Sequence, residues 1–137
     1  VNIVLSAKAR DMEQAGLIAD INVSLPENLP IADPDLCALF GNAVDNAIEA
    51  AKDAADKRIT IRARADKGLL MLRVTNAYAG KREEKTDGLF ATTKADKRAH
   101  GFGLRGMREI AVRNGGTLET TAKDGVFELV ACLPLAK

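Results

Sequence analysis

DPDLCALFGNAVDNAIEAAKDAA, residues 33–55, is the stretch that decides the fold. Asp33 can cap a helix, and Pro34 suits the first helical position, where a missing amide hydrogen is no loss. The apolar residues that follow recur at the three-and-four spacing that places them on one helix face: Leu36, Leu39, Phe40, Ala43, Val44, Ala47, Ile48 and Ala51. We therefore expect a long amphipathic helix that packs on the core.

Two asparagines lie beside this apolar stripe. Asn42 and Asn46 are one turn apart and Glu49 follows three residues later, so the three side chains share one side of the helix. Asparagine is a mediocre helix former, which suggests a role for the amides, and an amide oxygen suits a hydrated Mg²⁺ ion. The alternative is a merely solvated face on which Asn42 bonds a neighbouring loop, and the helix by itself favours this simpler interpretation.

Composition limits the classes of function. With 137 residues, 47% of them apolar, the chain is long enough for one domain with a substantial core. Its 20 Lys and Arg against 19 Asp and Glu leave a net charge of +1, too small to attract nucleic acid or an anionic membrane. Because no apolar run approaches the roughly 20 residues that span a bilayer and no signal peptide is visible, we expect a cytoplasmic domain without nucleic-acid or membrane contact. Cys37 and Cys132 are interpreted as unpaired, buried apolar residues of a reducing compartment.

Hydrophobic periodicity predicts a helical layer on a sheet. Helices are expected over residues 1–15, 33–55 and from Leu104 to a stop at Asn114-Gly115-Gly116, and strands over residues 17–25, 58–66, 69–76, 117–123 and 126–133. The tight turns Lys67-Gly68 and Asp124-Gly125 would close two hairpins. Since the strands alternate between apolar and polar residues, we predict an α+β two-layer sandwich whose mixed, mostly antiparallel five-stranded sheet is covered on one face by helices.

A glycine-rich stretch at the end of a long polar loop predicts an anion site. Residues 77–101 have no apolar period, and loops of this length inside a domain usually carry function. The loop ends in His100-Gly101-Phe102-Gly103-Leu104, which puts bare backbone amides at a helix start, where a phosphate is favoured. Thr92-Thr93-Lys94 offers two hydroxyls and a cation that could reach the same phosphates, although a solvated lysine is the simpler interpretation. The spacing matches neither a Walker loop nor a Rossmann fingerprint.

Asn76 is polar at a position that the strand period assigns to the core. It is in phase with Leu70, Leu72 and Val74, so its amide is expected to face the helix-covered side of the sheet. A buried amide needs a hydrogen-bond partner, which a bound ligand or a capping bond to a neighbouring turn would supply. The sequence leaves both interpretations open.

Together these motifs resemble the ATP-binding domain of the GHKL superfamily. The resemblance rests on the asparagine helix, the polar strand end, the long loop, the GFGL helix start and the last hairpin ending Cys132-Leu133-Pro134, and it covers about residues 17–134. Within the superfamily the chain is most similar to the catalytic domain of sensor histidine kinases, in particular the type found in peptide-sensing quorum kinases, whose helix reads DNAIEA as residues 45–50 do. Residues 16–137 would then be the ATP-binding catalytic domain with the Bergerat fold, and residues 1–15 the helix that leaves an upstream dimerisation hairpin.

The resemblance implies ATP and Mg²⁺ as cofactors and gives roles to individual residues. Asn46 matches the magnesium-binding Asn, and Asn42 matches the position one turn earlier that orients water or the γ-phosphate. Because that position is Glu in the family's hydrolases, Asn42 implies a kinase and not an ATPase. The other residues implied to contact the nucleotide are the lid cation Lys94, the phosphate-side residues His100, Gly101, Phe102, Gly103 and Leu104, and the adenine-side residue Asn76.

The family's first glycine box is altered here. Asn76 replaces the adenine-reading Asp, Tyr78 replaces the middle glycine, and Val126 stands where the last hairpin often carries a hydroxyl. A neutral amide accepts a hydrogen bond more weakly than a carboxylate does. We therefore expect weaker nucleotide binding, not a dead site.

As a kinase domain, the chain would pass the γ-phosphate to a histidine on a separate dimerisation domain and from there to a response regulator. His100 has no acceptor-helix motif around it and is not expected to be that histidine, and a homodimer is expected only for the full-length kinase. Since Val1 is not an initiator Met, we expect a part of a longer protein, such as the cytoplasmic part of a membrane-anchored sensor. Two alternatives are a stand-alone serine kinase of the anti-sigma type and an interaction module that has lost tight ATP binding.

Overall fold

The helices and strands follow the predicted order. The computed structural model describes residues 2–26, 28–78 and 102–135, so most of the predicted long loop lies outside the described residues. The elements are α1 (Asn2–Gln14), β1 (Ile18–Ser24), α2 (Asp33–Ala51), β2 (Arg58–Asp66), β3 (Leu69–Ala77), α4 (Phe102–Arg113), β4 (Thr117–Lys123) and β5 (Val126–Pro134).

The five strands form one mixed sheet in the order β1-β2-β3-β5-β4. The hairpins β2–β3 and β4–β5 and the central pair β3–β5 are antiparallel, and β1 joins the edge parallel to β2. Each hairpin turn has two residues, Lys67-Gly68 and Asp124-Gly125, and all four have positive φ, the turn geometry that matches the twist of the flanking strands. The predicted mixed, mostly antiparallel sheet is confirmed.

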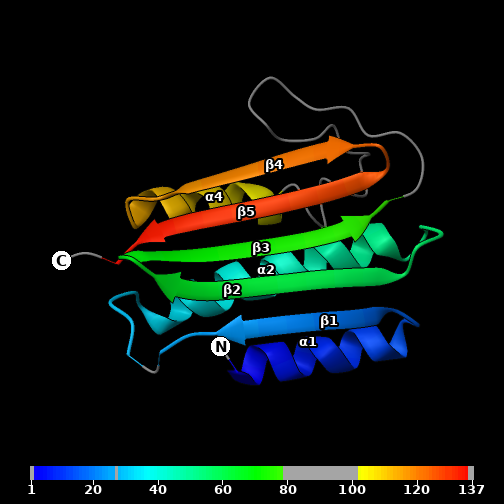
Figure 1. Ribbon diagram of the computed structural model, residues 1–137, viewed down its shortest axis with the longest axis horizontal. Helices are drawn as coiled ribbons and strands as arrows, with labels where there is room; N and C mark the ends of the chain where they lie inside the picture. The colour runs from blue at the N-terminus through cyan, green and yellow to red at the C-terminus, as the bar shows by residue number, and fades with distance from the viewer. Residues whose placement is uncertain (1, 27, 79–101, 136–137) are drawn as a thin grey trace.

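Two layers make up the described part of the chain, with helices on one face of the sheet and the other face open (Figure 1). α2 packs on β3 and β2, α4 packs on β4 and β5, and α1 packs on α2 and β1. Every apolar residue predicted for the buried face of α2 is buried, and Leu39, Phe40 and Val44 are fully so. The predicted α+β two-layer sandwich is therefore confirmed.

Glycines end α1 and α4 in the same way. Gly16 and Gly115 have φ near +80°, and the residue after each donates its amide to a carbonyl five residues back. Gly116 is required for a different reason, because a Cβ at this position would overlap the Cys132 carbonyl oxygen of β5. The predicted helix stop at Asn114-Gly115-Gly116 is confirmed, and its second glycine lets β4 begin close against β5.

Three details differ from the sequence prediction. Asp33 does not cap α2, because it is already the first helical residue and Ala32 precedes it without a side-chain capping bond. The helix ends at Ala51, four residues early, in a turn closed by the Ala54 amide on the Ala51 carbonyl. Cys37 and Cys132 are unpaired as predicted, but both are only partly buried.

Among the described residues, no helix is both long and apolar enough to cross a membrane.

Replacing Gly116 with Ala should destabilise the fold by about 1–3 kcal/mol, because the new methyl group would overlap the β5 backbone. The matched variant Gly106→Ala lies within α4, where a Cβ meets nothing within 4 Å, and should stabilise by about 0.5–1 kcal/mol. Urea unfolding of both variants measures the difference. Equal stability of the two would contradict the close approach at Gly116.

Candidate functional site

Asn42 and Asn46 lie beside the buried stripe of α2, and both side chains are partly exposed. Neither amide has a hydrogen-bond partner among the described residues, so the bond from Asn42 to a neighbouring loop is not seen within them. Asp45, between them, is held by Lys8 of α1 through an ion pair of 2.7 Å. Within the described part of the chain, both amides are without a hydrogen-bond partner.

Three side chains tie the start of α2 to the end of α4, and we call them the Asp35 clamp. Arg113 Nη2 donates to Asp35 Oδ1 at 2.7 Å, and Asn114 Nδ2 donates to Asp35 Oδ2 at 3.1 Å. The same Asn114 amide also donates to the Ile110 carbonyl at 2.8 Å, which fixes the end of α4. The clamp therefore fixes the position of α4 along the axis of α2.

The clamp has a consequence at the other end of the helix pair. α2 and α4 are in contact and run in opposite directions (Figure 1). Asn46 follows Asp35 by 11 residues, and Gly103 precedes Asn114 by the same number. At a rise of 1.5 Å per residue, both lie about 16 Å along their helices from the clamp. Asn46 and the first turn of α4 are therefore at the same level.

α4 begins at Phe102, so the glycine-rich stretch enters the helix as predicted. The first four amides of a helix have no carbonyl partner within it, and they lie at the positive end of its dipole. Leu104 is 5% exposed and belongs to the core, so only its backbone could face a phosphate. Lys94, His100 and Gly101 lie outside the described residues, as do Thr92 and Thr93.

Asn76 is 2% exposed and faces the helix-covered side of the sheet, as predicted. Its Nδ2 donates to the Ala77 carbonyl at 2.8 Å, which is a bond to the next residue of β3 and not a capping bond to a neighbouring turn. Its Oδ1 is buried and has no partner among the described residues. A buried acceptor without a donor is costly, and a ligand with an N–H group would satisfy it.

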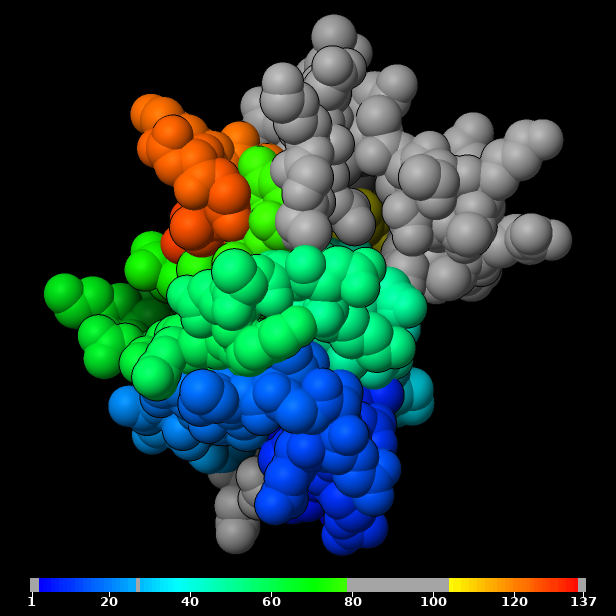
Figure 2. Space-filling model, turned by 90° about the vertical axis from the view of Figure 1, so that its right-hand side faces the viewer, coloured from blue at the N-terminus to red at the C-terminus, as the bar shows by residue number. Residues whose placement is uncertain are grey.

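The altered residues of the first glycine box lie near the turn of the β4–β5 hairpin. Tyr78 donates its amide to the Gly125 carbonyl at 3.1 Å, and its side chain is partly buried against the core. Val126 is 44% exposed. Figure 2 looks at this end of the molecule, where the β4–β5 hairpin (orange and red) stands beside the end of β3 (light green). A hollow lined by Arg62, Arg64 and Arg73 lies elsewhere, on the open face of the sheet.

The sequence reasoning did not find the Asp35 clamp or the Lys8–Asp45 ion pair. Both join residues far apart in the chain, and a charged residue on a helix gives no local sign of its distant partner. The sequence did contain one sign that Asn114 has a structural role, because Asn114 precedes the glycine stop and can bond back to its own helix.

Comparison with known proteins establishes the family. A family profile described as "GHKL domain" matches residues 32–134, which is most of the chain. The chain therefore belongs to the GHKL domain family. A search of curated proteins found no match to the sequence.

Solved structures of histidine kinases share the fold. The nucleotide-free catalytic domain of histidine kinase ThkA aligns with a TM-score of 0.75 and 21% identity over 99% of this chain and 92% of that one. The Acinetobacter baumannii histidine kinase AdeS aligns with a TM-score of 0.70 and 16% identity over 99% of this chain but 63% of its own. Full-length ShkA in complex with AMPPNP aligns with a TM-score of 0.72 and 20% identity over 99% of this chain and 29% of its own. The chain thus has the fold of a histidine kinase catalytic domain and spans less than two thirds of the AdeS and ShkA chains.

The Asp35 clamp predicts a loss of stability in acid. The Arg113 hydrogen bond, and after it the Asn114 hydrogen bond, lower the pKa of Asp35 below its ordinary value of 3.8. Its contribution is therefore complete above the unfolded-state pKa, near pH 4, and is lost as the pH falls through the lower folded-state pKa. Asp35→Asn should lower the urea midpoint at pH 7 and reduce the drop of that midpoint between pH 7 and pH 3.

Asp33→Asn is the matched control for this experiment, since it removes the same charge from the same helical turn. Asp33 has no side-chain bond to any described residue, so this variant should keep the wild-type acid dependence. Identical acid dependence of Asp35→Asn and Asp33→Asn would show that the clamp does not stabilise the fold.

Proposed function

We propose that the chain is the Mg·ATP-binding catalytic domain of a sensor histidine kinase. The observation that carries the proposal is the level that Asn46 and the first turn of α4 share in the helical layer, together with three polar groups that have no partner among the described residues. These groups are the side-chain amides of Asn42 and Asn46 and, at the end of β3, the buried Asn76 Oδ1. A nucleotide with its metal would satisfy all three, and membership of the GHKL family supports that ligand.

On the phosphate side, Asn46 would hold the metal through its amide oxygen, and Asn42 would orient water or the γ-phosphate one turn earlier. The backbone amides of Phe102, Gly103 and Leu104 would donate hydrogen bonds to phosphate oxygens at the start of α4. Bound Mg²⁺ would neutralise charge on the transferring group. Lys94, His100 and Gly101 complete the proposed set on the basis of the resemblance described above.

These residues would act by positioning the metal and the phosphates. Asn42 cannot act as a general base, because an amide does not titrate near neutral pH. The site as described would hold the γ-phosphate without activating a water molecule, which favours transfer to an acceptor over hydrolysis. The acceptor would be a histidine on a separate dimerisation domain of the same kinase, which in turn would serve a cytoplasmic response regulator in a two-component pathway.

The helix α1 would connect this domain to the dimerisation hairpin. Leu5 and Met12 of α1 are buried in the core, and Lys8 pairs with Asp45 beside Asn46. A Cβ added at Gly41 would touch Val4 and Lys8 of α1, so the two helices approach closely just before Asn42. These contacts place α1 against α2 and the core, and the division at residue 16, with α1 as the connection, rests on the resemblance described above. The DNAIEA sequence at residues 45–50 supports the peptide-sensing quorum type as the subgroup.

Asn46→Ala should weaken ATP binding in the presence of Mg²⁺ by at least about tenfold, since it removes the proposed metal ligand. Binding measured without Mg²⁺ should change little. Asn28→Ala, an exposed loop position, is the control and should bind as the wild type does. Isothermal titration calorimetry with and without Mg²⁺ separates the two effects. Equal Mg-dependent binding by wild type and Asn46→Ala would discard the metal role.

Asn76→Ala should remove discrimination between adenine and hypoxanthine. Wild type should bind ATP about five- to tenfold more tightly than ITP, because Asn76 Oδ1 would accept from the 6-amino group of adenine, where hypoxanthine has a carbonyl oxygen that cannot donate. The variant should bind both nucleotides with the lower affinity. Titration of both proteins with both nucleotides measures the difference. If the variant retains the wild-type preference for ATP, Asn76 does not read the base.

Two outcomes would favour the alternatives. If no adenine nucleotide raises the melting temperature, the interaction module suggested by Tyr78 is favoured. If the domain phosphorylates serine on a partner protein, the anti-sigma type of kinase is favoured.

A further inference from the structure

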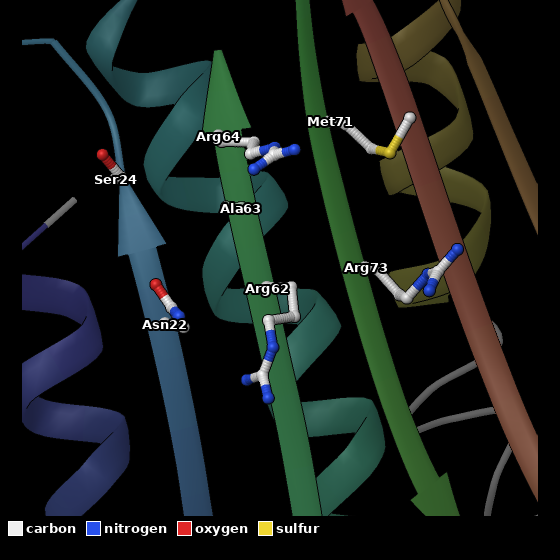
Figure 3. A pocket seen from close by; sticks show the side chains of 7 residues that line it. All are labelled: Asn22, Ser24, Arg62, Ala63, Arg64, Met71 and Arg73. Carbon is white, nitrogen blue, oxygen red and sulfur yellow. The ribbon is translucent and has the colours of Figure 1, made fainter. Parts of the chain in front are cut away.

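The open face of the sheet carries a cluster of arginines that the proposed nucleotide site does not use. Asn22 and Ser24 of β1, Arg62, Ala63 and Arg64 of β2, and Met71 and Arg73 of β3 line a shallow hollow of about 300 Å³, which we call the arginine hollow (Figure 3). No carboxylate and no aromatic ring is among these residues. The hollow lies on the face opposite the helices and is separate from Asn46 and Asn76.

The register of β2 and β3 places like charges against each other in this hollow. Arg62 and Arg73 are direct cross-strand partners, an arrangement that by itself is destabilising. Each turns away to a carboxylate outside the hollow. Arg62 bonds Asp20 with N–O distances of 3.2 and 3.3 Å, and Arg73 Nε lies 3.2 Å from Glu128 Oε2.

Positive charge nevertheless remains uncompensated in the arginine hollow. Arg64 has no ion pair or hydrogen bond with any described residue, and its side chain reaches from β2 toward β3 (Figure 3). Arg73 meets Glu128 through Nε, and its two terminal nitrogens have no partner in the described part of the chain. A guanidinium fork of this kind suits a carboxylate in a bidentate geometry.

The residues around the arginine hollow determine which kind of anion it can bind. Met71 and Leu69 are 40% and 43% exposed on the same face, so apolar surface adjoins the free guanidinium groups. Asp20 and Glu128 flank the hollow and would repel an extended polyanion such as nucleic acid or an anionic membrane. A short segment with one or two carboxylates beside an apolar side chain avoids this repulsion.

We propose that the arginine hollow docks an acidic segment of a partner protein, with carboxylates bound by Arg64 and Arg73 and an apolar side chain packed on Met71. The inference is independent of ATP binding, because it uses the opposite face of the sheet. It gives the domain a second interaction surface that is free while the helical face is engaged.

The test uses the ¹⁵N-labelled chain and two synthetic peptides, acetyl-Asp-Leu-Asp-amide and its Asn counterpart. The acidic peptide should shift the backbone amides of Asn22, Arg64, Met71 and Arg73, and the Asn peptide should not. Arg64→Glu should weaken binding at least about tenfold, and Arg64→Gln should weaken it less, because it removes the charge without reversing it. Arg58→Glu, the same charge change on the same strand but outside the hollow, should bind as the wild type does.

Several results would overturn the proposal. They are no shift at about 1 mM acidic peptide, equal response to the two peptides, or equal loss in Arg58→Glu and Arg64→Glu. Displacement of the peptide by inorganic phosphate or a short DNA duplex of equal or higher affinity would overturn the assignment to a protein segment. The same spectra report whether each variant is folded, and none of these outcomes depends on whether the chain binds ATP.

Discussion

The Asp35 clamp is the constraint on which the candidate site depends. Burial of apolar surface between α2, α4 and the sheet supplies most of the stability, but this force has no direction and would tolerate a helix that slides along its neighbour. The paired bonds from Arg113 and Asn114 to one carboxylate do have direction, and they hold α4 at one level against α2. The level of the α4 start relative to Asn46 follows from that bond and the equal rise of the two helices.

The alternation of side chains along the strands keeps the two proposed sites on opposite faces of the sheet. In β3, Leu70, Leu72, Val74 and Asn76 face the helices, whereas Met71 and Arg73 face away from them. A polar residue on the helix-covered face is buried and needs a hydrogen-bond partner, whereas a polar residue on the open face can remain in solvent. The proposed nucleotide site and the proposed docking surface are therefore built from neighbouring residues of one strand without competing for the same space.

Much of the fold was accessible from the sequence because its signals are local. The two Lys/Asp-Gly turns, the glycine stop of α4 and the apolar stripe of α2 each act within a few residues, and each was predicted correctly. The end of α2 was not, because the Ala-rich run after Ala51 has helical propensity that the turn at Ala54 overrides. The prediction that Asp33 caps α2 was also wrong. Pro34 is compatible with either of the first two helical positions, so it does not fix the residue at which the helix begins.

For the candidate site, the sequence indicated residue types and faces but not partners. It placed Asn76 on the buried face but could not give its partners, because the bond from Nδ2 to the Ala77 carbonyl and the lack of a described partner for Oδ1 depend on backbone geometry. The Asp35 clamp joins two helices through a contact that no local pattern reveals. The opposition of Arg62 and Arg73 could have been derived, because a two-residue turn at Lys67-Gly68 fixes which residues of the hairpin face each other.

The central pairing of β3 with β5 has a consequence for how this domain could diversify. Ala77 and Val126 are partners in that ladder, so the sheet itself holds the two ends of the long intervening chain. The entropy of closing a loop grows only with the logarithm of its length, and doubling the stretch between β3 and α4 would cost about 0.6 kcal/mol. Insertions or replacements in that stretch would leave the ladder intact, so its length and composition could change without altering the sheet.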